Sequence, residues 1–344
     1  MKTFASDNYS PVSPEIFEYL KKININHARS YGHDEYTEKA KKIIQYITGI
    51  SDAVVHFVLT GTAANVLSIK QCLRSTESLL VPQTGHINVN EAGASEAFTQ
   101  NKLIQIPTVD GKINVEVAEK ILLQELDNIP HAPRPKMLTI AQSTEYGTIY
   151  TIEELKKISQ FCKKYNLLLH MDLCRVYNAA VALNVEIKEI ISIVNPDIVS
   201  LGGTKNGLMF AEAIVIFNKK YQNDFEILQK QGMQLYSKMR YLSAQFIPFF
   251  EQGIWKRNAK LANDSCHYLY EQIKKVNGIE ITHPCETNHL FLKLPKEIIK
   301  PLQEITPFYV WDIYTDEVRL VTSFDTKKEE IDIFINKLKA LLLK

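Results

Sequence analysis

Short apolar runs alternate with amphipathic segments over much of this chain, and this alternation most constrains its fold. We expect strands at 53–59, 79–81, 102–106, 137–141, 167–171, 198–201 and 213–217. Helical patterns separate them, for example at 115–126 and behind Thr151, where Glu154 completes a capping box. Strands that alternate with helices predict an α/β fold with a mostly parallel sheet covered by helices on both faces.

The pattern changes after about Trp255. A long helix there is followed by short expected strands at 279–282, 290–294 and 318–321, and by a final helix capped by Thr326 and Glu329. We therefore predict an N-terminal arm and helix (1–22), a large domain (23–254) and a smaller C-terminal α/β domain (255–344).

Composition excludes several classes of function. The 344 residues are 45% hydrophobic with a net charge of +1 and no basic stripe, so neither nucleic acid nor an anionic membrane is an expected partner. No apolar run is long enough to span a bilayer. Five scattered cysteines without a Cys-x-x-Cys pair argue against a disulfide framework or a zinc site and favour a cytoplasmic location. We expect no catalytic metal.

The stretch from Asp197 to Gly207 carries an unusual lysine. The apolar strand at 198–201 ends on two glycines, then Thr204 and Lys205 follow. A lysine at the exit of a core strand is rarely buried unless it is paired or chemically used. Its amine can form an imine with an aldehyde cofactor. By itself the motif favours the plainer alternative of a solvated loop lysine.

A second candidate site opens the helix that follows the first strand. Gly61 and Thr62 lie in Thr-Gly-Thr-Ala-Ala-Asn, where unpaired backbone N–H groups and the helix dipole favour a phosphate. The alternative is a threonine-capped helix without a ligand.

Three polar residues follow the carboxyl ends of expected strands: His86, Asp172 and Lys205. Ligands of parallel sheets bind at that edge, so we expect the three to lie together. Asp172 can keep a pyridinium nitrogen protonated, or it can simply pair with Arg175. His86 can stack on a cofactor ring or transfer protons, although a structural histidine is the usual alternative.

Arg319 lies within an expected strand of the smaller domain. Its guanidinium fork suits the carboxylate of an amino acid, and the alternative is an arginine at a sheet edge facing water.

Together these segments resemble the low-specificity L-threonine aldolases of the β-eliminating lyase group. These are fold-type I pyridoxal-phosphate enzymes with a mostly parallel seven-stranded sheet. The resemblance covers almost the whole chain, through 4–10, 31–37, 57–65, 86–93, 142–147, 169–172, 201–207, 237–243 and 318–323.

The resemblance implies a role for each cofactor-binding residue. Lys205 would hold pyridoxal 5′-phosphate through its amine, and Gly61–Thr62, helped by Thr204, would bind the phosphate. His86 would stack on the ring, and Asp172 would pair with the ring nitrogen.

The resemblance also implies the substrate contacts and the assembly. Ser6 and Arg319 would hold the substrate carboxylate, and Arg175 would lie near the ring hydroxyl and the substrate. Arg240 would reach the phosphate of a neighbouring subunit, because family members are homotetramers built as dimers of dimers.

The implied reaction cleaves L-threonine, L-allo-threonine or a related β-hydroxy-α-amino acid to glycine and an aldehyde. Lys205, His86 and Asp172 are the expected catalytic residues, with His86 in proton transfer. The alternatives are another fold-type I β-eliminating lyase or aminotransferase, or a pyridoxal-phosphate-binding homologue with impaired catalysis.

One departure from the family pattern bears on the substrate. Leu173 and Cys174 stand where the family has glycine and a small residue, and Tyr177 stands where a small or apolar residue is common. Leu173 could force a different backbone path or reshape the substrate pocket.

Overall fold

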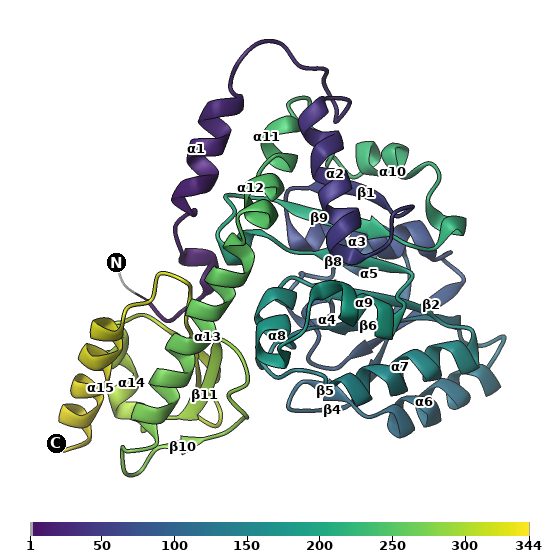
Figure 1. The fold of residues 1–344 in the computed structure, drawn as a ribbon. Coiled ribbons are helices and arrows are strands. Elements are labelled where there is room, and N and C mark those ends of the chain that lie inside the picture. The colour runs from purple at the N-terminus through teal and green to yellow at the C-terminus, as the bar shows by residue number, and fades with distance from the viewer. Residues whose placement is uncertain (1–2, 344) are drawn as a thin grey trace.

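The computed structural model describes residues 3–343 and contains a large and a small sheet (Figure 1). The seven-stranded sheet has the order β1-β9-β8-β7-β6-β2-β3, and the four-stranded sheet has the order β10-β11-β13-β12. A short hairpin, β4–β5, lies apart from both. The strands are β1 (Val54–Val58), β2 (Glu77–Pro82), β3 (Lys102–Ile106), β4 (Thr108–Val109), β5 (Lys112–Ile113), β6 (Arg134–Ala141), β7 (Leu168–Leu173), β8 (Ile198–Leu201), β9 (Glu212–Ile216), β10 (Glu280–Ile281), β11 (His289–Lys293), β12 (Tyr309–Asp312) and β13 (Glu317–Val321).

The large sheet is mostly parallel, as the alternation of strands and helices predicted. Strands β3, β2, β6, β7 and β8 pair in parallel, and β9 pairs antiparallel with both β8 and β1. The reason lies in the connections. Parallel neighbours need a long crossover, usually a helix, whereas only residues 202–211 join β8 to β9, so the chain turns straight back.

Helices cover both faces of the large sheet and one side of the small one (Figure 1). They are α1 (Pro14–Ile23), α2 (Glu35–Thr48), α3 (Gly61–Cys72), α4 (His86–Val89), α5 (Ala94–Thr99), α6 (Val115–Asp127), α7 (Ile152–Tyr165), α8 (Val176–Leu183), α9 (Ile187–Val194), α10 (Phe225–Gln231), α11 (Arg240–Ser243), α12 (Phe246–Glu251), α13 (Ile254–Ile273), α14 (Lys296–Gln303) and α15 (Lys328–Leu342). Short 3-10 turns are η1 (Asp7–Tyr9), η2 (Thr204–Asn206) and η3 (Lys219–Tyr221).

The capping box that was predicted for α7 is present. Thr151 Oγ1 accepts from the N–H of Glu154, and the Glu154 carboxylate accepts from the N–H of Thr151. The predicted cap of the last helix is wrong by one residue. The N-cap position is Lys327, whose N–H donates to Glu330, while the Thr326 hydroxyl accepts from the N–H of Ser323.

The apolar core divides between the two sheets, and α13 contributes to both parts. Trp255 and Ala259 near its start pack with the large sheet, whereas Leu269 and Ile273 near its end pack with the small sheet. The predicted boundary at 254/255 thus coincides with the start of a shared helix, and the division into domains stays a prediction.

The N-terminal arm is anchored far from its own place in the sequence. Phe4 packs edge-on against Phe334 of α15, with the ring centroids 5.3 Å apart. The N–H of Val321 donates to the Phe4 carbonyl at 2.8 Å. The N–H of Ser13 donates to the carbonyl of Gly207, just beyond η2, also at 2.8 Å. The arm therefore borders both sheets. Over residues 3–343 no helix combines the length and apolarity needed to cross a membrane.

Candidate functional site

A cavity of about 740 Å³ lies where the carboxyl edge of the large sheet meets the N-terminal arm and the small sheet. It brings together half of the predicted site residues, which come from positions spread over more than 300 residues of sequence: Ser6, His86, Arg175, Lys205 and Arg319.

Lys205 lies on η2, and the two glycines before it are needed for close packing. A Cβ atom on Gly202 would lie 2.5 Å from the Cα of Cys174, and one on Gly203 would collide with Leu208. Burial alone would lower the pKa of Lys205, but its attraction to Cys174 and to the nearby carboxylates outweighs this and raises the pKa above its usual value. Among the described contacts the amine has no hydrogen-bond or ion-pair partner, so only longer-range attraction acts on it.

Asp172 lies near the end of β7 as an ionised, hydrogen-bonded carboxylate. Its Oδ2 accepts from Asn65 Nδ2 at 3.0 Å, and its Oδ1 accepts from the N–H of Cys174 at 2.9 Å. Burial opposes ionisation, but Lys205 and these hydrogen bonds outweigh it and lower the pKa of Asp172. The Asp172–Arg175 ion pair that we considered from the sequence does not form.

His86, the first residue of α4, is oriented by a carboxylate that the sequence did not single out. Its Nδ1 lies 2.7 Å from Glu91 Oε1, and that oxygen also accepts from Asn65 Nδ2 at 2.9 Å. Asn65 therefore links Glu91 to Asp172. Asn65 ends the motif that begins at Thr60, and Glu91 lies within the motif 86–93, so both residues stood in stretches that the sequence had already singled out.

Glu145 is a second carboxylate beside His86 that sequence reasoning missed. Its Oε1 accepts from the backbone N–H of His86 at 2.8 Å, and the side chain lines the main cavity. Burial raises the pKa of Glu145 to about 6. The site therefore contains a carboxyl group that changes protonation near neutral pH.

Arg175 is neutralised by Asp7 of the N-terminal arm. Its Nε and Nη2 donate to the two oxygens of Asp7 at 2.7 and 2.8 Å, and both side chains are buried. Asn288 Nδ2 also donates to Asp7, at 3.1 Å. Burial disfavours the carboxylate, but Arg175 outweighs it and holds the pKa of Asp7 well below its usual range.

Arg319, like Lys205, is a cation of the cavity without a carboxylate partner within residues 3–343, whereas Arg175 is paired with Asp7. Its guanidinium lies 4.7 Å from the centre of the Trp311 ring and 5.7 Å from that of Tyr309. Its Nε is buried without a hydrogen-bond partner among the described residues. Burial, and then repulsion by Arg175, lower the pKa of Arg319 to about 10. Such a group favours an incoming anion.

The remaining predicted cofactor residues lie outside this cavity. Gly61 and Thr62 form the first turn of α3, behind the cap made by Thr60, and a Cβ on Gly61 would meet open space. Thr204 Oγ1 accepts from the N–H of Ala211 at 3.2 Å. Arg240 donates to the carbonyls of Ile25 and Asn26 and lies away from the other residues within the single chain.

The departures from the family pattern at 173 and 177 affect the core and not the cavity. Leu173 is the last residue of β7, in extended backbone, and is completely buried. Tyr177 is also buried, and its hydroxyl donates to the Gly202 carbonyl at 2.6 Å. Neither residue lines the main cavity. Tyr177 instead supports the glycine turn that carries Lys205.

Glu212 is a further missed residue, at the start of β9 directly behind that turn. Its Oε2 accepts from the N–H of Gly203 at 2.8 Å. Burial raises its pKa from 4.5 to about 7. Between those pH values the folded protein retains a proton that the unfolded chain has released, so the free energy of unfolding falls as pH rises and levels off above pH 7.

We expect Glu212→Gln to remove that loss. Glutamine keeps an acceptor for Gly203 and cannot ionise, so the variant should exceed the parent in stability at pH 8 by about 3 kcal/mol, at ~1.4 kcal/mol per pKa unit. The difference should shrink to under about 1 kcal/mol at pH 5. Urea unfolding at both pH values measures this, and a parallel pH dependence in the two proteins would refute it.

Comparison with known proteins places the chain in a family. Residues 3–296 match the model of the beta-eliminating lyase family. The low specificity L-threonine aldolase of Pseudomonas sp. (strain NCIMB 10558) is 34% identical over 98% of this chain and 97% of the relative. That of Pseudomonas aeruginosa is 36% identical over 95% of this chain and 94% of the relative.

A solved structure supports the same placement. The threonine aldolase of Leishmania major superimposes with a TM-score of 0.93 at 30% identity, over 99% of this chain and all of that one. Aspartate aminotransferase from Thermus thermophilus, with a TM-score of 0.74 at 12% identity over 99% of this chain and 92% of that one, shares the fold alone. The fold-type I architecture predicted from the motifs is thus confirmed, and the chain belongs to the beta-eliminating lyase family.

Proposed function

We propose that the protein cleaves L-threonine and L-allo-threonine to glycine and acetaldehyde, with pyridoxal 5′-phosphate held by Lys205. The family and its low-specificity threonine aldolase members support this proposal. The observation that carries it is the half-buried amine of Lys205 beside the half-buried, ionised carboxylate of Asp172 at one edge of the sheet, close enough that each shifts the other's pKa.

The residues present fit the cofactor. Asp172 is fixed by two donors and is ionised, as a partner for a protonated ring nitrogen must be. Gly61 opens the first turn of α3 onto free space, where unpaired N–H groups suit a phosphate. Thr204, beside Lys205, is assigned to the same phosphate by the family resemblance. When bound, the cofactor supplies an aldehyde that joins the substrate amine and a ring that accepts the electron pair left at Cα.

The substrate carboxylate is assigned to Arg319 and Ser6. Two arginines line the cavity, and Asp7 neutralises only Arg175. The unbalanced charge of Arg319 therefore selects an anionic group, and the guanidinium fork fits a carboxylate. Arg175, which is held by Asp7, lines the cavity beside Arg319. This arrangement orients an α-amino acid with its amine toward Lys205.

Proton transfer is assigned to His86. Glu91 occupies Nδ1, which leaves Nε2 available to the substrate hydroxyl, directly or through water. Glu145 holds the backbone of His86 and can retain or release a proton near neutral pH. The aromatic side chains of Tyr146 and Trp311 line the same cavity and limit the entry of water.

We further propose a homotetramer, a dimer of dimers, in the cytoplasm. Figure 1 shows α1 standing away from the large sheet. The segment from the arm to the loop after α1 exposes several large apolar side chains: Tyr9, Phe17, Ile25 and Tyr31. Arg240 lies beside this segment, which supports its assignment to the phosphate of a neighbouring subunit. Free cysteines throughout the described chain suit a reducing compartment. Light scattering of the purified protein tests the assembly.

A direct assay separates the proposal from its alternatives. The purified protein is incubated with pyridoxal 5′-phosphate, its visible absorbance is recorded, and acetaldehyde and glycine are measured after addition of L-threonine or L-allo-threonine. Equal amounts of both products are expected. Ammonia with a keto acid would indicate a β-eliminating lyase, and transfer of the amino group would indicate an aminotransferase. Absorbance without turnover would indicate a binding protein with impaired catalysis.

Replacing Arg319 with methionine should raise the KM for L-threonine. A hydrogen bond to a charged group contributes about 1.5–3 kcal/mol, which corresponds to roughly 10- to 100-fold in KM with a smaller change in kcat. Arg319→Lys keeps the charge without the fork and should fall between the two. Steady-state kinetics measures the effect, and an unchanged KM in the methionine variant would reassign the carboxylate.

A further inference from the structure

Two cysteines outside the proposed active site lie in contact. Cys266, on α13, and Cys285, in the loop between β10 and β11, have their Sγ atoms 3.5 Å apart. Both are free thiols. A disulfide needs an S–S distance of about 2.05 Å, so the two sulfur atoms must approach by roughly 1.4 Å to bond.

The two thiols differ in access. Cys266 is fully buried, whereas Cys285 is partly exposed and lines a second cavity of about 530 Å³ between α8, α9 and α13. The hydrogen bond with Cys285, together with burial, holds the pKa of the Cys266 thiol well above its usual value. Cys285 is therefore the sulfur that an external reagent meets first, and Cys266 is placed to resolve the product.

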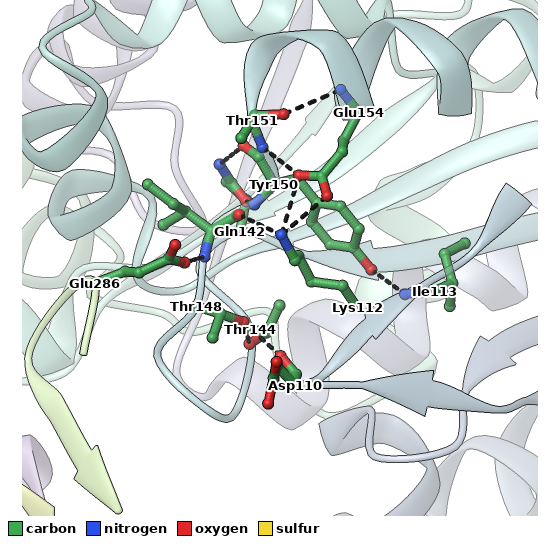
Figure 2. Close-up of polar contacts among 11 residues, drawn as sticks. Asp110, Lys112, Ile113, Gln142, Thr144, Thr148, Tyr150, Thr151, Glu154 and Glu286 are labelled. Carbon is green, nitrogen blue, oxygen red and sulfur yellow. Dashed lines mark hydrogen bonds and ion pairs between the residues drawn. The ribbon is translucent and has the colours of Figure 1, made fainter. Parts of the chain in front are cut away.

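The residues that follow Cys285 are bonded to the segment that borders the main cavity. The Glu286 carboxylate accepts from the N–H of Ile149 at 2.7 Å (Figure 2). The Thr287 hydroxyl donates to the Gly147 carbonyl at 2.7 Å, and Asn288 donates to Asp7. We therefore expect a displacement of Cys285 to be felt through the hydrogen bonds of Glu286, Thr287 and Asn288.

The receiving segment is itself tightly fixed. Figure 2 shows Thr148 bonded to the Asp110 carbonyl, and Tyr150 bonded through its backbone to both ends of the Gln142 amide. Just before it, Glu145 and Tyr146 line the main cavity. Because the segment is held by these hydrogen bonds, a shift of Glu286 would strain it, and we expect that strain to reach its neighbours Glu145 and Tyr146.

We propose that Cys266 and Cys285 form a reversible thiol–disulfide site whose oxidation by a low-molecular-weight disulfide lowers the activity. The Cys285 thiolate attacks one sulfur of glutathione disulfide, that S–S bond breaks, and one glutathione leaves. Cys266 then gives up its proton, attacks Sγ of Cys285 and releases the second glutathione. The protein loses two electrons and two protons, and the oxidant is reduced to two thiols.

The disulfide itself is independent of the proposed function, and only the activity measurement rests on it. The full-length protein, with pyridoxal 5′-phosphate added, is equilibrated with glutathione disulfide and then mapped by mass spectrometry. We expect a loss of two thiols and a cross-linked peptide pair that contains Cys266 and Cys285. Cys266→Ser and Cys285→Ser should each abolish the cross-link, and the control Cys162→Ser should not.

Two further measurements test the coupling. Amide hydrogen exchange across residues 144–151 should change on oxidation, and dithiothreitol should restore it. Acetaldehyde release should fall on the order of tenfold, because an ångström of displacement can cost up to about 10²-fold. Failure to form the Cys266–Cys285 cross-link, or a cross-link that leaves exchange in 144–151 unchanged, would overturn the proposal. If exchange changes but neither redox state cleaves threonine, the proposed function fails and the thiol site stands.

Discussion

Lys205→Ala is expected to reduce acetaldehyde release from L-threonine by on the order of 10³-fold or more, because it removes the only group proposed to bond the cofactor covalently. The visible absorbance obtained with added pyridoxal 5′-phosphate should also shift to that of the free aldehyde. The measurements are steady-state kinetics and absorbance spectroscopy of the purified variant.

The control for charge is Lys205→Arg. Arginine retains a cation near Asp172 but cannot form an imine under these conditions, so it should lose activity to nearly the same extent. Lys219→Ala, at an exposed position paired with Asp52, should behave like the parent protein. An alanine variant at 205 that keeps more than about a tenth of the activity would contradict the proposed covalent role.

Breaking the buried pair between Asp7 and Arg175 is expected to have the largest effect on stability. Asp7→Ala leaves a buried guanidinium without its carboxylate, which typically costs about 3–5 kcal/mol. Urea unfolding at pH 7 measures the loss. Activity should fall as well, because Arg175 would be free to move within the cavity and compete with Arg319 for the substrate carboxylate.

The double variant Asp7→Ala/Arg175→Met identifies the cause. It leaves no uncompensated charge, so it should be more stable than Asp7→Ala alone. The pH dependence provides a second check. Because the pKa of Asp7 is depressed in the folded state, its stabilising contribution is complete above the unfolded value of about 4 and is lost as pH falls further. The variants should lack this acid sensitivity, and a double variant less stable than the single would refute the explanation.

Periodicity was enough to locate most of the fold. The seven expected strands match those of the large sheet, because short apolar runs between helices are typical of buried strands. The antiparallel pairing of β9 was not predicted, since it depends on the short connection after β8 and not on a pattern within either strand. The start of α15 was placed one residue off, because Thr326 is an ordinary cap residue but bonds to Ser323 instead.

The residues that line the candidate site were largely predicted, but the carboxylates that hold them in place were not. Lys205, His86 and Arg319 could be selected because a charged residue at a strand end or within a strand stands out, and all three line one cavity. Asp7 and Glu145 could not be selected in this way. Asp7 meets Arg175 across 168 residues of sequence, and Glu145 meets the backbone of His86 across 59, so only the folded chain reveals these pairs.

The anchoring of the N-terminal arm has a consequence for the order of events during synthesis. Asp7 leaves the ribosome long before Arg175, Asn288 and the Val321 amide that pairs with Phe4. The arm therefore cannot make all of these contacts until residue 321 has emerged. Because Ser6 and Tyr9 of the arm line the cavity, a nascent polypeptide halted before residue 321 would contain the lysine turn and yet lack part of its binding site.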